Sequence, residues 1–461
     1  MRYVSTRGEA PELGFAEVLR AGLAIDGGLY VPAEVPRWST EDIAALAGLP
    51  YEDAALRVMA PFCAPDFDET TLRRLIGEAY AGFGHEARAP LVQLAPNHFL
   101  LELFHGPTLA FKDFAMQVIG RLFQESLARD GSRITIVGAT SGDTGSAAIE
   151  AFRGLANVDC FILFPHGRVS EVQRRQMTTA TEANVHAIAV DGTFDDCQAL
   201  VKAMFADAAF RDEVGLSAVN SINWGRVLAQ VVYYFTAAVA LGAPHRAVSF
   251  TVPTGNFGDI YAGSIARGMG LPIERLVVAT NRNDILHRCL ETGEYRPDGV
   301  EPTISPSMDI QVSSNFERAL FDAYDRDPAP VRQAMHDLRA GGFTVSQGAI
   351  DSLRETYASG RVSEEETRAA IHRYRERTGE VVCPHTAVGL HVAEAHLGSV
   401  PMVTLATAHP AKFPDAVEAA TGHRPALPPR LSHLMDGEER IARLANDLGE
   451  VEAYVRANRR L

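Results

Sequence analysis

Beyond Pro96 the sequence repeats one unit, which is a short apolar segment followed by a turn and a helix-like stretch. The helix-like stretches include Ala115–Ala128, Thr144–Leu155 and Phe194–Ala208. Such alternation predicts an α/β fold, in which mostly parallel sheet carries helices on both faces. Ligands of these folds bind at the carboxyl ends of the strands, so functional residues are expected in the turns that follow the apolar segments. These segments are Phe99–Phe104, Arg133–Val137, Cys160–Phe164, His186–Val190, Ala247–Val252, Leu276–Ala279 and Met402–Ala406.

The first part of the chain has a different pattern. Helical periodicity occurs over Gly14–Ala24, Ser39–Ala47 and Glu69–Tyr80, and a single strand-like run occurs at Gly28–Val31. We therefore expect a mainly helical N-terminal domain over residues 1–95 and a larger α/β domain over residues 96–461.

Two segments of the larger domain are expected to be irregular. Tyr295–Pro306 is rich in proline, and we interpret the stretch around it, about residues 292–312, as a candidate lid. Pro425–Arg430 is expected to link the domain to a C-terminal helix over Ser432–Asn458.

Composition excludes several classes of partner. The net charge of −15, without blocks of like charge, argues against nucleic acid. The five cysteines are odd in number and far apart, which predicts neither a disulfide framework nor a metal site and fits a reducing cytoplasm. Met1–Tyr30 has no pattern of a secretory signal. Val227–Ala243 is too short for the roughly 20 apolar residues of a membrane span, so we expect a buried helix and no membrane partner. A monomer and a dimer both remain open.

A lysine occupies the first of the strand-end turns. The segment His105–Asp113 follows Phe99–Phe104 and opens a helix, so Lys112 is predicted to point into the crevice above the sheet. A catalytic lysine needs partial desolvation, because its amine must be neutral to act as a nucleophile. Taken alone, a lysine here is more often a surface residue at a helix start, where Asp113 would suit the helix dipole.

Three other turns carry groups that suit a ligand. In Val252–Asp259, two glycines allow close backbone approach, and the N–H groups of the helix start form a cradle for a cofactor phosphate. Thr140–Ser146 lacks the lysine of a Walker loop, but its hydroxyls and N–H groups could hold a carboxylate. After the last apolar segment, the hydroxyl of Thr407 could face a ring nitrogen. For each of the three, an ordinary capping turn or loop start is the alternative.

An arginine begins the apolar helix near Val227. Arg226 ends the segment Asn220–Arg226, which also contains Ser221. A buried unpaired charge is costly, so Arg226 is predicted to bind an anion, and an internal salt bridge is the alternative.

Together these segments resemble the fold-type II pyridoxal-phosphate (PLP) enzymes, and more closely the threonine synthases. The resemblance covers nearly the whole chain. It implies a fold of two lobes, each of mostly parallel sheet flanked by helices, with the smaller lobe at about residues 130–222. Further segments similar to that family are Tyr3–Gly8, Gly22–Pro32, Ser307–Ile310 and Ser314–Arg318.

The resemblance also implies the roles of individual residues. Lys112 would hold PLP as a Schiff base and act as general base at the substrate's Cα and Cβ. Thr407 would face the pyridine nitrogen, and Asp143 would lie near the ring's O3′ or the substrate. Related proteins can have Asn where this chain has Asp259. The cofactor phosphate would rest on Gly255, Asn256, Phe257, Gly258 and Asp259.

The implied reaction converts O-phospho-L-homoserine and water to L-threonine and phosphate. Arg226 and Ser221 would hold the substrate phosphate, while Ser141 and Thr144 would contact the substrate and the attacking water. One alternative is a PLP-dependent phospho-lyase or dehydratase that releases 2-oxobutyrate and ammonia. Another, of a different class, is a regulatory protein that binds nucleotides in its glycine-rich loops, but such a protein has no use for a strand-end Lys112.

Overall fold

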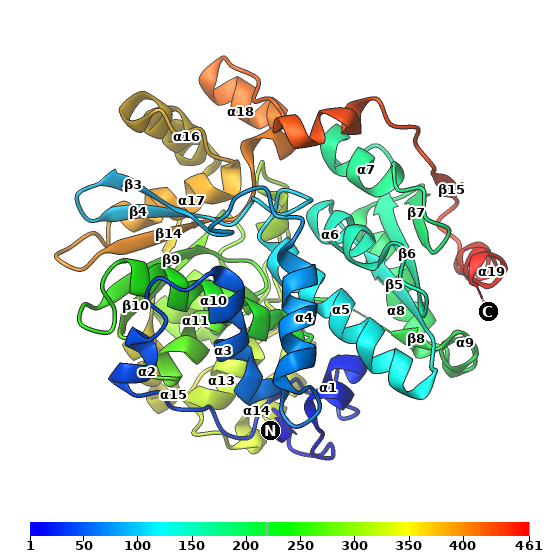
Figure 1. Ribbon diagram of the computed structural model, residues 1–461, viewed down its shortest axis with the longest axis horizontal. Coiled ribbons are helices and arrows are strands. Elements are labelled where there is room, and N and C mark those ends of the chain that lie inside the picture. Colours follow the sequence, from blue (N-terminus) through cyan, green and yellow to red (C-terminus); the bar gives the residue numbers. More distant parts are fainter. Residues whose placement is uncertain (218–219, 461) are drawn as a thin grey trace.

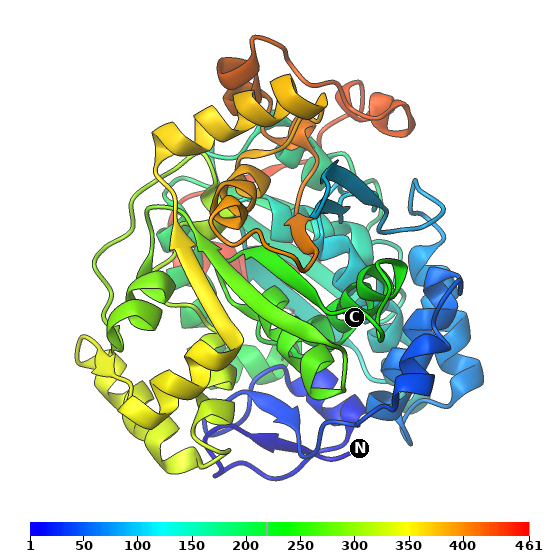
Figure 2. The same cartoon turned by 90° about the vertical axis from the view of Figure 1, so that its left-hand side faces the viewer.

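The molecule is built around two β-sheets whose strands are mostly parallel (Figures 1 and 2). The structure is a computed structural model that describes residues 1–217 and 220–460. The larger sheet has the strand order β13-β10-β9-β14-β4-β3, and only β3, at its edge, runs antiparallel to its neighbour. The predicted α/β fold with helix-covered parallel sheet is therefore confirmed. The strands are β3 (Leu91–Ala95), β4 (His98–Glu102), β9 (Val248–Pro253), β10 (Ile273–Thr280), β13 (Tyr357–Arg361) and β14 (Met402–Ala406).

The larger sheet is covered on both faces. Val277 and Ala279 of β10 pack with helix α17 (Pro384–Glu394), whereas the alternate residues Leu276 and Val278 belong to the main core. Successive side chains of a strand point to opposite faces, so both faces are buried, and the central strands β9 and β14 are buried along their whole length. The main core includes the helices α10 (Trp224–Ala240) and α11 (Gly258–Gly268).

The smaller sheet has the order β15-β7-β6-β5-β8, with all strands parallel. Helices α5 and α6 pack on one face, and α8, α9 and α19 pack on the other. Its strands are β5 (Ile134–Ala139), β6 (Val158–Pro165), β7 (Val185–Val190), β8 (Leu216–Ser217) and β15 (Ala442–Leu444). The helices are α5 (Lys112–Asp130), α6 (Asp143–Phe152), α8 (Phe194–Ala206), α9 (Ala208–Val214) and α19 (Leu448–Asn458).

The predicted C-terminal helix over Ser432–Asn458 is wrong in its first half. Helix α19 begins only at Leu448, and β15 precedes it. The reason is tertiary: β15 pairs with β7 at the edge of the smaller sheet, and these ladder hydrogen bonds outweigh local helical propensity.

The N-terminal region packs against α10. Strands β1 (Tyr3–Ser5) and β2 (Tyr30–Pro32) form an antiparallel pair, and the ring of Tyr3 lies 5.8 Å from that of Trp224 at the start of α10. α10 is the apolar segment predicted as a buried helix, and this prediction is confirmed. The helices of the region are α1 (Phe15–Ala21), α2 (Thr40–Ala44), α3 (Tyr51–Cys63) and α4 (Glu69–Tyr80).

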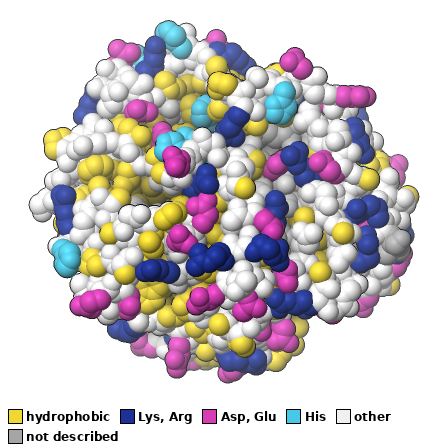
Figure 3. All heavy atoms as spheres, in the orientation of Figure 1, with side chains coloured by type: hydrophobic (Ala, Val, Ile, Leu, Met, Phe, Trp, Pro, Cys, Tyr) yellow, Lys and Arg dark blue, Asp and Glu magenta, His cyan; other side chains and the backbone are white. Residues whose placement is uncertain are grey.

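The remaining elements connect or cover the two sheets. Across residues 1–217 and 220–460, no helix has the length and apolar character needed to span a bilayer. Basic and acidic side chains are interspersed over the face shown in Figure 3. The elements are α7 (Glu171–Thr178), α12 (Ile285–Thr292), β11 (Glu294–Tyr295), α13 (Phe316–Ala323), α14 (Pro328–Arg339), β12 (Phe343–Thr344), α15 (Gln347–Thr356), α16 (Glu364–Thr378) and α18 (Pro414–Thr421), with the 3₁₀ helices η1 (Pro306–Met308), η2 (Pro410–Lys412) and η3 (Pro429–Met435).

Candidate active site

Lys112 is the first residue of α5, beyond the carboxyl end of β4. The preceding turn is fixed by the chain that follows β14: the Phe111 N–H donates to the Thr407 carbonyl at 2.8 Å, and the His409 N–H donates to the Leu109 carbonyl at 3.0 Å. Leu109 has a φ of 64°, a left-handed conformation that is uncommon outside glycine. Backbone hydrogen bonds thus join the turn before Lys112 to the chain after β14, at the carboxyl ends of the strands.

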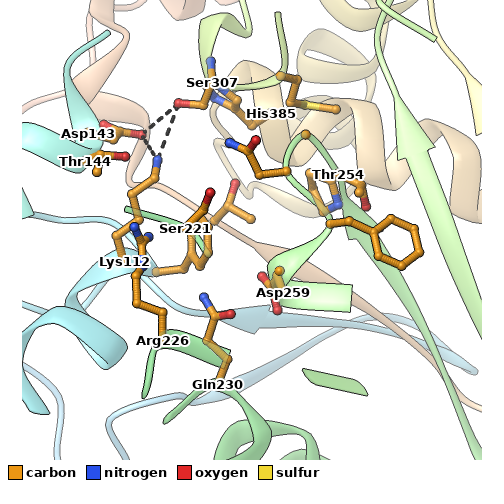
Figure 4. A pocket seen from close by; sticks show the side chains of 18 residues that line it. Lys112, Asp143, Thr144, Ser221, Arg226, Gln230, Thr254, Asp259, Ser307 and His385 are labelled. Atoms are coloured by element: carbon orange, nitrogen blue, oxygen red, sulfur yellow. Dashed lines mark hydrogen bonds and ion pairs between the residues drawn. The ribbon is translucent and has the colours of Figure 1, made fainter. Parts of the chain in front are cut away.

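The amine of Lys112 is buried in a polar setting. Its side chain is 9% exposed, and Nζ donates to Asp143 Oδ2 at 3.3 Å and to Ser307 Oγ at 3.5 Å (Figure 4). Burial lowers the pKa of Lys112, and the cations of Lys412 and Arg226 lower it further, against the opposing effect of Asp143. These effects favour the neutral, nucleophilic amine.

Asp143 begins α6 and is held by several donors. Gln173 donates to its Oδ1 at 2.9 Å, and Lys412 Nζ lies 3.0 Å from the same oxygen. Burial alone would raise the pKa of Asp143, but Lys412 and Lys112 outweigh burial and hold that pKa well below its ordinary value. The carboxylate is therefore ionised beside Lys112.

The loop before α6 is held together by hydrogen bonds to Thr140. Thr140 Oγ1 accepts the backbone N–H groups of Gly142 at 2.9 Å and Gly145 at 2.8 Å. Gly142 has a φ of 135°, which side chains other than hydrogen rarely allow. Thr144 lines the pocket, whereas Ser141 is not among the lining residues.

The turn between β9 and α11 forms the predicted cradle. Its N-cap, Phe257, has a φ of 64°, and within the described chain no side chain caps the helix. A Cβ at Gly255 would lie 2.8 Å from the Ser307 carbonyl oxygen, so only glycine fits there. Uncapped N–H groups at a helix start, next to a left-handed residue, are suited to bind phosphate.

Asp259 lies in the first turn of α11, on the wall of the pocket. The hydroxyls of Tyr233 and Tyr234, both on α10, donate to its Oδ1. Burial raises the pKa of Asp259 to about 7, although the two hydroxyls favour the ionised form. At neutral pH this acid is therefore protonated for part of the time, so it repels an anion in the cradle less than a full carboxylate would.

Arg226 and Ser221 line the opposite side of the pocket from Ser307 (Figure 4). Arg226 is buried in the first turn of α10, and burial lowers its pKa to about 10. Ser221 Oγ lies 3.1 Å from Ser314 Oγ. The arginine thus stays cationic at neutral pH and faces the same space as Lys112.

Two residues that close the pocket were not predicted as site residues. Ser307 lies in η1, and its backbone N–H donates to His385 Nε2 at 3.1 Å. Burial lowers the pKa of His385 to about 4, so its ring is neutral. The only hint in the sequence was the similarity of Ser307–Ile310 to a family segment, because the contact itself joins residues 78 positions apart.

Lys412 was also missed. It ends η2, its side chain is 0% exposed, and it reaches Asp143 from behind the pocket wall. Nothing in its local sequence distinguishes it from a surface lysine.

The structure brings most of the predicted residues together. About 80 Å³ of the pocket is open to the centre of a water-sized sphere. Its walls also include Phe111, Gln230, Pro253, Thr254 and Met308. The predicted site residues that line the pocket are Lys112, Asp143, Thr144, Ser221, Arg226, Gly255, Asn256, Phe257, Gly258, Asp259 and Thr407.

Three family models match the chain. Residues 2–80 match the family described as "Threonine synthase N terminus". Residues 83–331 match "Pyridoxal-phosphate dependent enzyme", and residues 386–455 match "Threonine synthase, C-terminal".

Individual proteins are similar over nearly the whole chain. The threonine synthase of Pseudomonas aeruginosa is 55% identical over 459 residues, which cover 99% of this chain and 98% of that one. A crystal structure of PLP-bound threonine synthase from Brucella melitensis has a TM-score of 0.98 and 57% identity, with 100% of both chains covered. For the yeast threonine synthase structure the TM-score is 0.94 at 39% identity, with 99% of this chain and 98% of that one covered. The chain therefore belongs to the threonine synthase family of pyridoxal-phosphate-dependent enzymes.

Proposed function

We propose that the chain converts O-phospho-L-homoserine and water to L-threonine and phosphate. One observation carries the proposal: a buried lysine and a buried arginine face the same pocket, which also contains a glycine cradle. This arrangement offers one place for the cofactor phosphate and a separate cation for the substrate phosphate.

The residues present fit PLP. Lys112 would hold the cofactor through its amine, and the loop Gly255–Asp259 would hold the phosphate by its N–H groups. The hydroxyl of Thr407 would face the pyridine nitrogen. A hydroxyl partner leaves this nitrogen largely unprotonated, unlike a carboxylate partner. The uncapped start of α11 and the lowered pKa of Lys112 support this assignment.

When bound, PLP supplies an electron sink for negative charge on the substrate carbons. Lys112 would remove the proton at Cα and later one at Cβ, as a positioned general base does. Protons returned to Cγ and Cα complete the methyl group and the α-carbon of threonine. The lowered pKa of Lys112 and its hydrogen bonds to Asp143 and Ser307 suit this role. Asp143, ionised beside it, would orient the amine.

Arg226 and Ser221 would hold the substrate phosphate. A guanidinium presents a planar fork of donors that matches phosphate oxygens. After the Cγ–O bond breaks, the phosphate would stay at Arg226 and could accept a proton from the attacking water. The burial of Arg226 supports this role, because burial strengthens its attraction for an anion.

The synthase and phospho-lyase reactions differ in the last step. A synthase holds water against Cβ, whereas a lyase releases 2-oxobutyrate and ammonia. We assign water placement to the hydroxyl of Thr144, which lines the pocket next to Asp143. Ser141 lies on the same loop but does not line the pocket, so its removal would change the product ratio less than removal of the Thr144 hydroxyl.

Product analysis with purified enzyme, O-phospho-L-homoserine and ¹⁸O-labelled water tests the proposal. We expect threonine with the label in its hydroxyl group. Thr144→Val should shift the products toward 2-oxobutyrate, and Ser141→Ala, on the same loop, is the matched control. Dominant 2-oxobutyrate and ammonia from the unmodified enzyme would instead establish the phospho-lyase.

We propose that residues 1–95 form an N-terminal domain and residues 96–461 the catalytic domain, whose smaller lobe spans about residues 130–222. The matches at residues 2–80 and 83–331 support this division.

We further propose that about residues 292–312 act as a lid. Asp309, which accepts hydrogen bonds from Asn281 and Thr303, would anchor this segment beside the pocket. The five buried free cysteines support a cytoplasmic location.

A further inference from the structure

Lys412 ties three segments of the site together from outside the pocket. Its Nζ lies 3.0 Å from Asp143 Oδ1 and donates to the Thr108 carbonyl at 2.7 Å. Thr108 belongs to the turn before Lys112, Asp143 begins α6, and Lys412 itself follows β14. A lysine with a 0% exposed side chain must gain from such contacts, because burying an ammonium group is costly.

Asp143 lies between two ammonium groups. Lys412 approaches its Oδ1 at 3.0 Å, and Lys112 approaches its Oδ2 at 3.3 Å. One carboxylate balances one positive charge, so two protonated lysines here would leave an excess charge in a buried site. Lys412 makes the shorter contact with Asp143 and also donates to the Thr108 carbonyl at 2.7 Å. The other contact of Lys112 is longer, because Ser307 Oγ lies 3.5 Å from its Nζ. The lysine that loses its proton more easily is therefore Lys112.

The other ionisable groups around the pair do not reverse this balance. Asp113 accepts hydrogen bonds from the Thr108 N–H and hydroxyl, and burial raises its pKa. His385 and His409 are neutral, because burial lowers the pKa of each to about 4. Arg226 is a further cation on the Lys112 side and disfavours a proton on Lys112.

We propose that Lys412 is a positioning residue for the reaction: it balances the charge of Asp143, so that the nitrogen of Lys112 remains neutral and free to bond the cofactor and accept protons. The inference rests on the proposed role of Lys112. Without Lys412, Asp143 would have Lys112 as its only cation among the contacts described above and would stabilise a proton on it. An opposite charge within ~4–6 Å shifts a pKa by about 1–3 units.

The test is a pH titration of the cofactor absorption in the holoenzyme. The protonated and neutral forms of the Lys112–cofactor bond absorb at different wavelengths, so the midpoint reports the proton affinity of the Lys112 nitrogen within that bond. Lys412→Met should raise the midpoint by about one pH unit or more, which is tenfold in the proton equilibrium. Lys412→Arg keeps the charge and should restore the midpoint toward that of the unmodified enzyme.

Asp143→Asn gives an opposite prediction. It removes the anion and leaves Lys412 charged, so the midpoint should fall. The double variant Lys412→Met with Asp143→Asn removes both charges, and its midpoint should return toward the unmodified value. A purely structural role for Lys412 would not produce shifts of opposite sign that cancel. Lys202→Met, the same substitution at an exposed lysine of α8, should cause no shift.

The outcomes separate this inference from the proposed function. Borohydride reduction and peptide mapping locate the cofactor in each variant. Attachment at Lys202 or Lys412 would contradict the proposed role of Lys112 and this inference with it. Attachment at Lys112 with the same midpoint in Lys412→Met would overturn only the inference. If Lys412→Met retains no cofactor, the comparison of Asp143→Asn with the double variant tests the inference instead. Equal midpoints in these two variants would overturn the inference, because Lys412 would then have no effect on the Lys112 nitrogen.

Discussion

His385 Nε2 accepts the backbone N–H of Ser307 at 3.1 Å, which places a neutral imidazole against the segment that closes the pocket. Burial lowers the pKa of His385 to about 4, whereas an unfolded histidine titrates near ~6.5. The unfolded state therefore binds the extra proton first as the pH falls. The stability that the neutral ring provides is complete above pH ~6.5 and is lost progressively down to about pH 4.

His385→Gln should remove part of this acid sensitivity, because glutamine can accept the same hydrogen bond without titrating. Between pH 7 and pH 5 we expect the unmodified protein to lose about 2 kcal/mol more of its unfolding free energy than the variant does. Urea unfolding at both pH values measures the difference. His336→Gln, at an exposed histidine of α14, is the matched control. Equal pH dependence in His385→Gln and the unmodified protein would contradict the prediction.

Gly255→Ala should weaken cofactor binding. The new Cβ would lie 2.8 Å from the Ser307 carbonyl oxygen, so either the cradle or η1 must move. We expect the dissociation constant for PLP to rise by about tenfold or more, which corresponds to ~1.4 kcal/mol. Gly348→Ala on α15, where the Cβ would meet nothing within 4 Å, should leave PLP binding unchanged. An unaltered affinity in Gly255→Ala would mean that the cofactor phosphate binds elsewhere.

Lys112→Ala should abolish turnover and covalent labelling by borohydride. The chain contains only three lysines, Lys112, Lys202 and Lys412, so peptide mapping gives an unambiguous answer. Lys202→Ala should keep both the label and the activity, since this residue lies on an exposed surface of α8. A label on Lys202 or Lys412 in the unmodified enzyme would refute the assignment.

Arg226→Lys should weaken substrate binding more than cofactor binding. Lysine keeps the charge but loses the planar fork that matches phosphate oxygens. We expect KM for O-phospho-L-homoserine to rise at least about tenfold, which is ~1.4 kcal/mol, with cofactor absorbance retained. Arg121→Lys, at a guanidinium that contacts the Ala151 carbonyl on the far side of α5, is the control. An unchanged KM would favour an internal role for Arg226.

Site residues could be predicted from the sequence where a reactive or glycine-rich segment directly follows an apolar strand. Lys112, the loop Gly255–Asp259 and Thr407 each follow an apolar strand, and parallel strands bring their carboxyl ends to one edge. Arg226 was predictable because a charge stands at the start of an apolar helix. These signals are local in the sequence, and the pocket contains the corresponding residues.

His385 and Lys412 could not be predicted in this way. Their roles arise from contacts with Ser307 and Asp143, which lie 78 and 269 positions away in the sequence. The same limit explains the error before α19. The helical pattern of residues 432–447 is a local property, but the pairing of β15 with β7 depends on the edge of a distant sheet.

The pairing of β15 with β7 also sets an order of events during synthesis. About 250 residues separate the two strands along the chain, and β7 lies second in the sheet only because β15 covers it. At ~5–20 residues per second, a ribosome needs about 10–50 s to make the intervening segment. If β7 pairs with β6 during that time, β7 is an open edge of the sheet, which is a template for pairing with other chains. Completion of the smaller sheet therefore has to wait until Ala442–Leu444 has left the ribosome.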